Sequence, residues 1–159
     1  MSDYSTCMRE GVIKCGSDFR TRGETNILLG LPRNAGFMRG GTSIRGENAI
    51  VCWPKDEDVK NGWVNEQSDF AEDIGRGYRA FLTFSERNVD EAKNRKHISH
   101  VLDTPAERTR YVFWQEKNGN AIWYKFFGKF QLDEEATRKE GKCIFRRIAS
   151  EMSCAHNLG

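Results

Sequence analysis

The segment of this sequence best suited to bind an anion is the glycine-rich stretch GFMRGGTSIRG at residues 36–46. Four glycines in eleven residues exclude a helix and predict a mobile or tightly turned loop with exposed backbone amides. Arg39 and Arg45 lie within it, and amides beside guanidinium groups can hold a phosphate. There is no GxxxxGK[ST] pattern and no GxGxxG opening a helix, so neither standard type of nucleotide-binding enzyme is expected. A plain flexible loop is the alternative.

Trp63 is the aromatic residue that the sequence favours as a ligand contact. It lies in the stretch GWVNEQSD, where its neighbours are polar residues and glycine and show no strand pattern. Such a ring is either a loop anchor packed on the core or a platform for a base, a contact worth about 1 to 3 kcal/mol. Tyr78 is the second stacking candidate, and Asn65 or Asp69 is expected to recognise the edge of the base.

The remaining titratable residues give little sign of catalysis. His97 and His100 stand three residues apart without an HExxH frame, so we expect them on the solvated surface of a helix. Asp69, Glu72 and Asp73 form an acidic cluster that can hold a divalent ion, although an acidic run on a loop is usually only solvated.

Five cysteines, an odd number, and the lack of a secretory signal in residues 1–25 predict a reducing, cytoplasmic location. No CxxC pair occurs, and Cys154 with His156 supplies only two of the four ligands of a structural zinc. We therefore expect neither a metal site nor a cofactor. No apolar run approaches the roughly 20 residues of a membrane span, so no membrane partner is expected.

The formal net charge is only +2, but the charges are unevenly distributed along the chain. Lys and Arg outnumber the acids by two in residues 1–50 and by three in residues 107–159, whereas acids exceed them by three in residues 51–106. An anion site should therefore draw on both ends of the chain. Arg146 and Arg147, near the carboxy-terminus, join Arg39 and Arg45 as the expected phosphate contacts.

The elements that must position these residues are mainly strands. Tyr111 to Phe130 holds the strongest signal, because two aromatic, β-rich runs flank an Asn-Gly turn, the pattern of a hairpin. Apolar or alternating runs predict further strands, at residues 49–53, 78–85 and 143–148. The run at 26–31 fits a strand or one helical turn.

Helices are predicted to be few and small. Residues 88–101 are expected to form a surface helix with Asn88 as N-cap and Glu91 completing a capping box, and residues 133–142 a short helix. Residues 1–25 lack a sustained period and are expected to form a polar arm or loosely packed lead-in. The chain of 159 residues suits one domain. The class is α+β, mainly β, with five to seven strands in a strongly curved sheet or small barrel.

The carboxy-terminal third resembles SRA-like and other PUA-like domains of bacterial restriction and modified-base-recognition proteins. The resemblance is carried by a "YxFxGxFxLD" strand and a last "xYxRI"-type strand, matched here by Tyr124, Phe126, Gly128, Phe130, Leu132 and Asp133, then Phe145, Arg147 and Ile148. It covers about forty residues of the chain. It implies a small β-barrel that holds a base in a pocket between curved strands, often flipped from a duplex and sometimes methylated.

These observations favour a nucleic-acid-binding module, with DNA preferred over RNA as partner, that recognises a base and perhaps a modified one. A compact metal-dependent nuclease or nucleotide-processing enzyme using the acids near Asp69 is one alternative. A protein-interaction factor, such as an inhibitor, is another.

Overall fold

The computed structural model describes residues 1–36, 41–44, 46–73 and 77–154. Its helices are α1 (Tyr4–Glu10), α2 (Arg22–Leu28), α3 (Glu91–Asp103) and α4 (Glu134–Glu140), with a 3-10 turn η1 (Pro105–Arg108). Its strands are β1 (Val12–Lys14), β2 (Asp18–Phe19), β3 (Gly41–Ser43), β4 (Ile50–Cys52), β5 (Glu57–Asp58), β6 (Trp63–Asp73), β7 (Tyr78–Asn88), β8 (Thr109–Asn118), β9 (Ala121–Leu132), β10 (Cys143–Ala149) and β11 (Glu151–Ser153).

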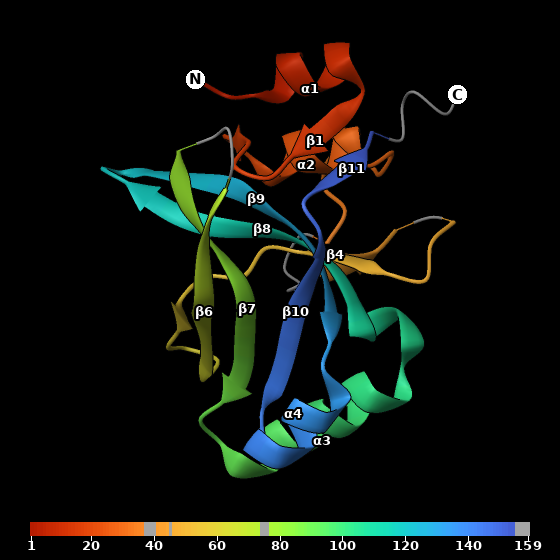
Figure 1. The fold of residues 1–159 in the computed structure, drawn as a ribbon, viewed down its shortest axis with the longest axis vertical. Helices are drawn as coiled ribbons and strands as arrows, with labels where there is room; N and C mark the ends of the chain where they lie inside the picture. The colour runs from red at the N-terminus through yellow and green to blue at the C-terminus, as the bar shows by residue number, and fades with distance from the viewer. Residues whose placement is uncertain (37–40, 45, 74–76, 155–159) are drawn as a thin grey trace.

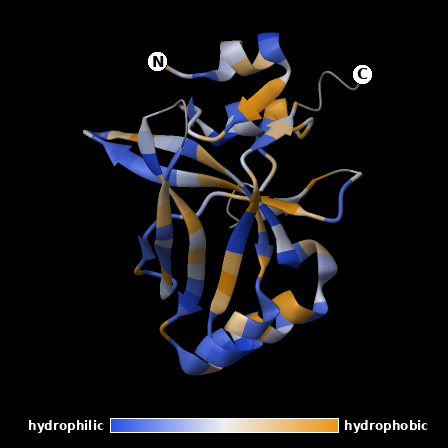
Figure 2. Cartoon of the chain, viewed as in Figure 1, coloured by the Kyte–Doolittle hydropathy of each residue, from blue (hydrophilic) through white to orange (hydrophobic). Residues whose placement is uncertain are grey.

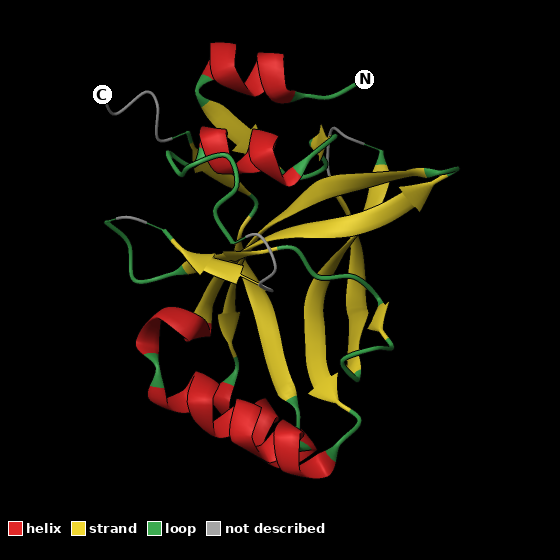
Figure 3. Cartoon of the chain, turned by 180° about the vertical axis from the view of Figure 1, so that it is seen from behind, coloured by secondary structure: helices red, strands yellow, loops and turns green. Residues whose placement is uncertain are grey.

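One large sheet dominates the fold, with strand order β3-β4-β8-β9-β10-β7-β6-β5 and β2 added beside β9. The β4–β8 pair is parallel and the other pairs are antiparallel. Helices α1 and α2 lie at one end with the β1–β11 pair, and α3 and α4 lie at the other (Figures 1 and 3). The mainly β, α+β class is thus confirmed. Over the described residues the sheet ends at β3 and β5 and does not close into a barrel.

The predicted hairpin is present, and it is buried on both faces. β8 and β9 pair antiparallel up to Asn118 and Ala121, and Gly119 occupies the turn with φ 63°. Tyr111 and Phe113 point into a core shared with α1, α2 and β1. Val112 and Trp114, the alternate residues, point into a second core formed with β7, β10 and α3. The hairpin therefore separates two hydrophobic clusters. At the far end of the molecule, helix α4 is hydrophilic along most of its length (Figure 2).

Gly128 permits the sharp bend in β9. The β8–β9 register shifts between Val112 and Phe113, opposite this glycine, and the β10 register shifts beside Ala149. Gly128 has φ 119°, and a Cβ there would lie 2.3 Å from the Ala149 carbonyl oxygen. Only glycine satisfies both the positive φ and the close approach of β10.

Residues 1–25 do not form a loosely packed arm. Cys7, Ile13 and Phe19 are buried in the first core, and β1 pairs with β11 near the other end of the chain. The elements here are two to seven residues long, so none displays a full hydrophobic period in sequence. The apolar run near residue 26 belongs to α2, whose cap Thr21 accepts a hydrogen bond from the Glu24 amide.

The longest strand not predicted from the sequence lies within the acidic stretch at residues 55–77. This is β6, an eleven-residue strand paired only by β7 along most of its length, and an edge strand can carry polar residues on both faces. The strands predicted near 49–53, 78–85 and 143–148 correspond to β4, β7 and β10. Helix α3 is capped by Asp90 and not by Asn88, since the Asp90 carboxylate accepts from the Lys93 amide.

None of the helices in the described ranges is long and apolar enough to cross a membrane.

Replacing Gly128 by alanine is expected to destabilise the protein by about 2 to 4 kcal/mol, because it adds a strained φ and a clash with β10. The matched control is Gly119→Asn, where φ is also positive but a Cβ would have no neighbouring atom within 4 Å, and asparagine tolerates this conformation. Urea unfolding curves measure both. Equal stability of Gly128→Ala and the parent protein would contradict this account of the bend.

Candidate nucleic-acid interface

A segment at residues 53–58, called the strap here, runs between β8 and β6, two strands of the sheet that do not pair with each other. On one side the Gln115 amide of β8 donates to the Pro54 carbonyl oxygen at 2.7 Å. On the other side the Asn65 amide of β6 donates to the Asp56 carbonyl oxygen at 2.9 Å, and Asn65 Nδ2 donates to the Lys55 carbonyl oxygen at 2.7 Å. The strap thus bridges a gap that no continuous strand pairing closes.

Along the strap runs a groove of about 1020 Å³. It extends from α2, past the strap, to the amino-terminal part of β6 and to α3. Three kinds of side chain line it: cations, aromatic rings with amides, and a cluster of ionisable groups. The cations are Arg20, Arg22, Arg33 and Lys55. The rings and amides are those of Trp53, Trp63, Tyr124, Asn65 and Gln115, and the ionisable cluster consists of Glu86, His97, Glu107 and Arg110.

The α2 end of the groove is basic. Arg20 donates to the Ile122 carbonyl oxygen at 2.7 Å, and the Arg22 guanidinium lies 4.8 Å from the ring centroid of Trp53. Gly23 brings Arg33 close to α2, because a Cβ at that position would lie 2.6 Å from Arg33 Cγ. Within the described ranges neither Arg33 nor Lys55 forms an ion pair. Their charges remain available to an anionic ligand.

The middle of the groove combines aromatic rings with anchored amides. Trp53 is buried, and its Nε1 donates to Thr25 Oγ1 at 3.0 Å. Trp63 is half-buried on the groove wall, with its ring edge-on to His97 at a centroid distance of 4.7 Å. Asn65 is held by the strap through Nδ2, while its buried Oδ1 has no hydrogen-bond partner among the residues described. These groups offer flat and polar contacts from a rigid wall.

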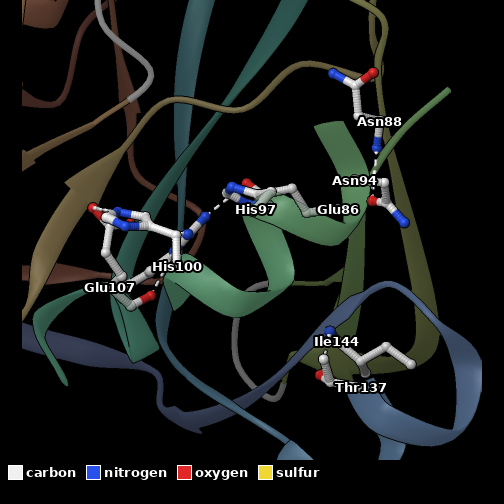
Figure 4. A network of polar contacts seen from close by, with 9 residues as sticks. Glu86, Asn88, Asn94, His97, His100, Glu107, Thr137 and Ile144 are labelled. Atoms are coloured by element: carbon white, nitrogen blue, oxygen red, sulfur yellow. Dashed lines mark hydrogen bonds and ion pairs between the residues drawn. The ribbon is translucent and has the colours of Figure 1, made fainter. Parts of the chain in front are cut away.

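A cluster of ionisable side chains around the buried Arg110 forms the α3 end of the groove (Figure 4). Arg110 donates to Glu86 Oε2 at 2.6 Å and to Glu107 Oε2 at 3.2 Å, and its guanidinium lies 4.4 Å from the ring centroid of Phe145. His97 Nε2 contacts the other oxygen of Glu86. Burial alone raises the pKa of the Glu86 carboxyl, but Arg110 and His97 outweigh it and bring this pKa from 4.5 down to about 2. Glu86 is therefore ionised at neutral pH.

The four side chains predicted to hold a base are not brought together. Trp63 and Asn65 both line the groove, on alternate positions of β6, so Trp63 belongs to a strand and not to a loop. Tyr78 lies elsewhere, with its hydroxyl donating to Cys15 Sγ at 2.9 Å and to Asp73 Oδ2 at 3.2 Å. Asp69 is exposed, with φ 54°, and lies 3.7 Å from Arg146.

Of the four predicted phosphate contacts, the two that the structure describes, Arg146 and Arg147, do not line the groove. Arg39 and Arg45 fall outside the described residues. Arg146 lies beside Asp133 and Asp69, and Arg147 lies 3.6 Å from Asp73 and donates to Cys15 Sγ at 3.1 Å. The acids suspected of holding a divalent ion are thus partly paired with arginines. Among the described residues they do not form a group of three close metal-binding side chains.

Several groove residues were missed by reasoning from sequence. Arg20 and Arg22 flank Thr21, which starts α2 with the capping-box spacing Thr-x-x-Glu, and this pattern was a usable signal. Glu86 and Arg110 carried no such signal. They are 24 residues apart and meet only because β7 and β8 face the same core.

Replacing Arg110 by methionine is expected to cost about 3 to 5 kcal/mol of stability, because the buried Glu86 carboxylate loses its counter-charge. Arg95→Met is the matched control. Arg95 is exposed, its pair with Glu91 is 4.0 Å long, and its loss should change stability by less than about 0.5 kcal/mol. The free energy of unfolding in urea distinguishes the two, and equal effects would show that the cluster contributes no more than a surface pair.

A search of curated proteins gave no match. Among solved structures, the fold resembles that of the 5-hydroxymethylcytosine-specific restriction enzyme AbaSI, with a TM-score of 0.72 and 18% sequence identity. The match covers 95% of this chain and 45% of that one, so the chain spans less than half of that enzyme's length. The family model of the SET and RING associated domain, SRA, matches residues 7–154. This chain therefore belongs to the SRA domain family.

Proposed function

We propose that the groove beside the strap is where this SRA domain binds duplex DNA and receives a modified base flipped out of the helix. SRA domains bind DNA and flip modified bases. The observation that carries the proposal is the order of side chains along the groove. Cations on α2 and the strap come first, then aromatic rings and amides, then a buried polar end. This order suits DNA whose phosphate backbone contacts the basic end of the groove while a flipped base enters the aromatic and polar part.

The cations at the α2 end suit phosphate binding because they come from different elements along one rim. Arg22 is the first residue of α2 and Arg20 precedes its cap Thr21, Arg33 belongs to the loop after α2, and Lys55 belongs to the strap. Such contacts position a protein on the duplex without reading its sequence. Three of these four cations come from the basic amino-terminal part of the sequence, residues 1–50.

The wall formed by β6 suits a base because it offers a ring and an amide two residues apart on the same strand. Trp63 can stack on a flat ligand, and the Asn65 amide is fixed in place by the strap. AbaSI is specific for 5-hydroxymethylcytosine. A cytosine modified at the 5-position is therefore the base that we propose for this groove. We also propose a cytoplasmic location, since all five cysteines are free thiols.

The double substitution Arg33→Ala and Lys55→Ala should weaken binding to a DNA duplex and flatten its dependence on salt. Each lost phosphate contact removes about one unit from the slope of log affinity against log salt concentration. The control is Arg138→Ala with Lys139→Ala on α4, whose residues do not line the groove. Fluorescence anisotropy with a labelled duplex at several salt concentrations measures both. If the α4 pair reduced affinity and the groove pair did not, the DNA would lie on another face.

Replacing Trp63 by alanine should cost about 1 to 3 kcal/mol of the affinity for a duplex containing 5-hydroxymethylcytosine, because a stacking platform is lost. Binding to an unmodified duplex should change less. Trp123→Ala is the control, since Trp123 lies near the hairpin turn and outside the groove lining. A large drop in melting temperature with unchanged affinity for both duplexes would show that Trp63 serves only to anchor the fold.

A further inference from the structure

The ionic cluster at the α3 end contains three side chains whose chemistry is that of a transition-metal site. Glu86 of β7, His97 of α3 and Cys143 of β10 each offer one ligand atom, and these atoms all lie within 4.8 Å of one another. Carboxylate, imidazole and thiolate are the ligands that proteins use for zinc. We propose that these three residues bind a zinc ion, a role separate from the proposed contacts with DNA.

The sheet register fixes two of the three ligands. Cys143 and Glu86 are directly opposite each other in the antiparallel β7–β10 pair, so their side chains leave the same face of the sheet. Cys143 is fully buried, and no hydrogen bond to its sulfur is found among the described residues. The thiol has no structural hydrogen bond to lose when a metal replaces its proton.

Hydrogen bonds also hold the helix that supplies the third ligand. Asn94 lies one helical turn before His97 on α3. Its Oδ1 accepts from the Asn88 amide of β7 at 3.0 Å (Figure 4). Its Nδ2 donates to the Gly141 carbonyl oxygen, two residues before β10, at 2.8 Å. These two bonds tie α3 to both strands that carry the other ligands. The three donors are therefore presented by one rigid frame.

The spacing and the charge of the cluster both suit zinc. Tetrahedral coordination with the usual zinc bond lengths requires ligand atoms roughly 3.3 to 3.7 Å apart, so a bound ion would shift the His97 and Glu86 side chains from positions in which the three ligand atoms lie within 4.8 Å of one another. Glu86 and Glu107 together carry two negative charges against the one positive charge of Arg110. Zn²⁺ with a Cys143 thiolate adds one net positive charge and balances the cluster. The thiolate disfavours Mg²⁺ and Ca²⁺, which prefer oxygen ligands.

Only three protein ligands are present among the described residues, so the fourth position belongs to water or a ligand. Glu86 and His97 line the groove, while Cys143 lies behind them. The open position therefore faces the groove. This three-ligand site differs from the four-ligand zinc site considered for Cys154 and His156.

Titration of the metal-free protein with Co²⁺ tests the proposal. We expect one equivalent to bind, with thiolate-to-cobalt charge-transfer absorption and the intense d–d bands of a tetrahedral site, and Zn²⁺ should displace it. Cys143→Ala should abolish the charge-transfer band. His97→Gln, a partly exposed position less critical for folding, should lower metal affinity by about tenfold or more. Zn²⁺ should also raise the melting temperature of the parent protein but not of Cys143→Ala.

Cys52→Ala and Cys154→Ala are the controls, and both should keep the absorption band. Cys52 is the informative one because it too is buried and lines the groove. Loss of the band in Cys52→Ala with its retention in Cys143→Ala would overturn the assignment. So would the absence of a charge-transfer band in the parent protein, which would leave His97 as a hydrogen-bonding partner of Glu86 alone. Neither result would bear on DNA binding, which is measured separately without added metal.

Discussion

The structure depends on a hairpin that is buried on both of its faces. Residues along β8 alternate between two hydrophobic cores, so Phe113 packs with α2 while its neighbour Trp114 packs with β7. Neither core can form without the hairpin, since it supplies a wall to each. The bend at Gly128 then turns the far part of β9 toward β10. This one constraint explains how the short amino-terminal elements, which contribute Ile13, Phe19 and Leu28 to the first core, pack against the sheet.

The sheet does not close on itself over the described residues, and the strap spans its opening beside the groove. Hydrogen bonds from Gln115 and Asn65 fix the strap to β8 on one side and to β6 on the other. A loop bound at both sides is rigid, and it presents Lys55 beside the arginines of α2. The result is a groove with fixed walls whose basic rim and polar end have different chemical roles.

The buried ionic cluster shows how the fold can keep charges away from water. Arg110 contacts two carboxylates and the face of Phe145, and together these contacts offset the cost of removing its guanidinium from solvent. The same cluster holds β7, β8 and α3 together at the end of the groove. An arrangement of this kind favours a single geometry, since each charge has only one place where it is compensated.

The sequence determined those parts of the protein that depend on near neighbours. The Asn-Gly turn and the aromatic alternation specified the β8–β9 hairpin, and the apolar runs specified β4, β7 and β10, because period and turn chemistry act over a few residues. The resemblance around Gly128 also indicated the family that the full chain confirms. Edge strand β6 was not predictable in this way, because its polar pattern is stable only when β7 pairs with it.

Only the tertiary structure decided which side chains share a site. Trp63 and Asn65 reach the groove, whereas Tyr78 and Asp69 are drawn to other partners, although all four lie within sixteen residues. Arg110 meets Glu86 across the core through strand order that no local pattern encodes. The physical reason is that a hydrophobic period fixes which face of a strand is buried, while register and the packing of distant elements fix what lies opposite that face.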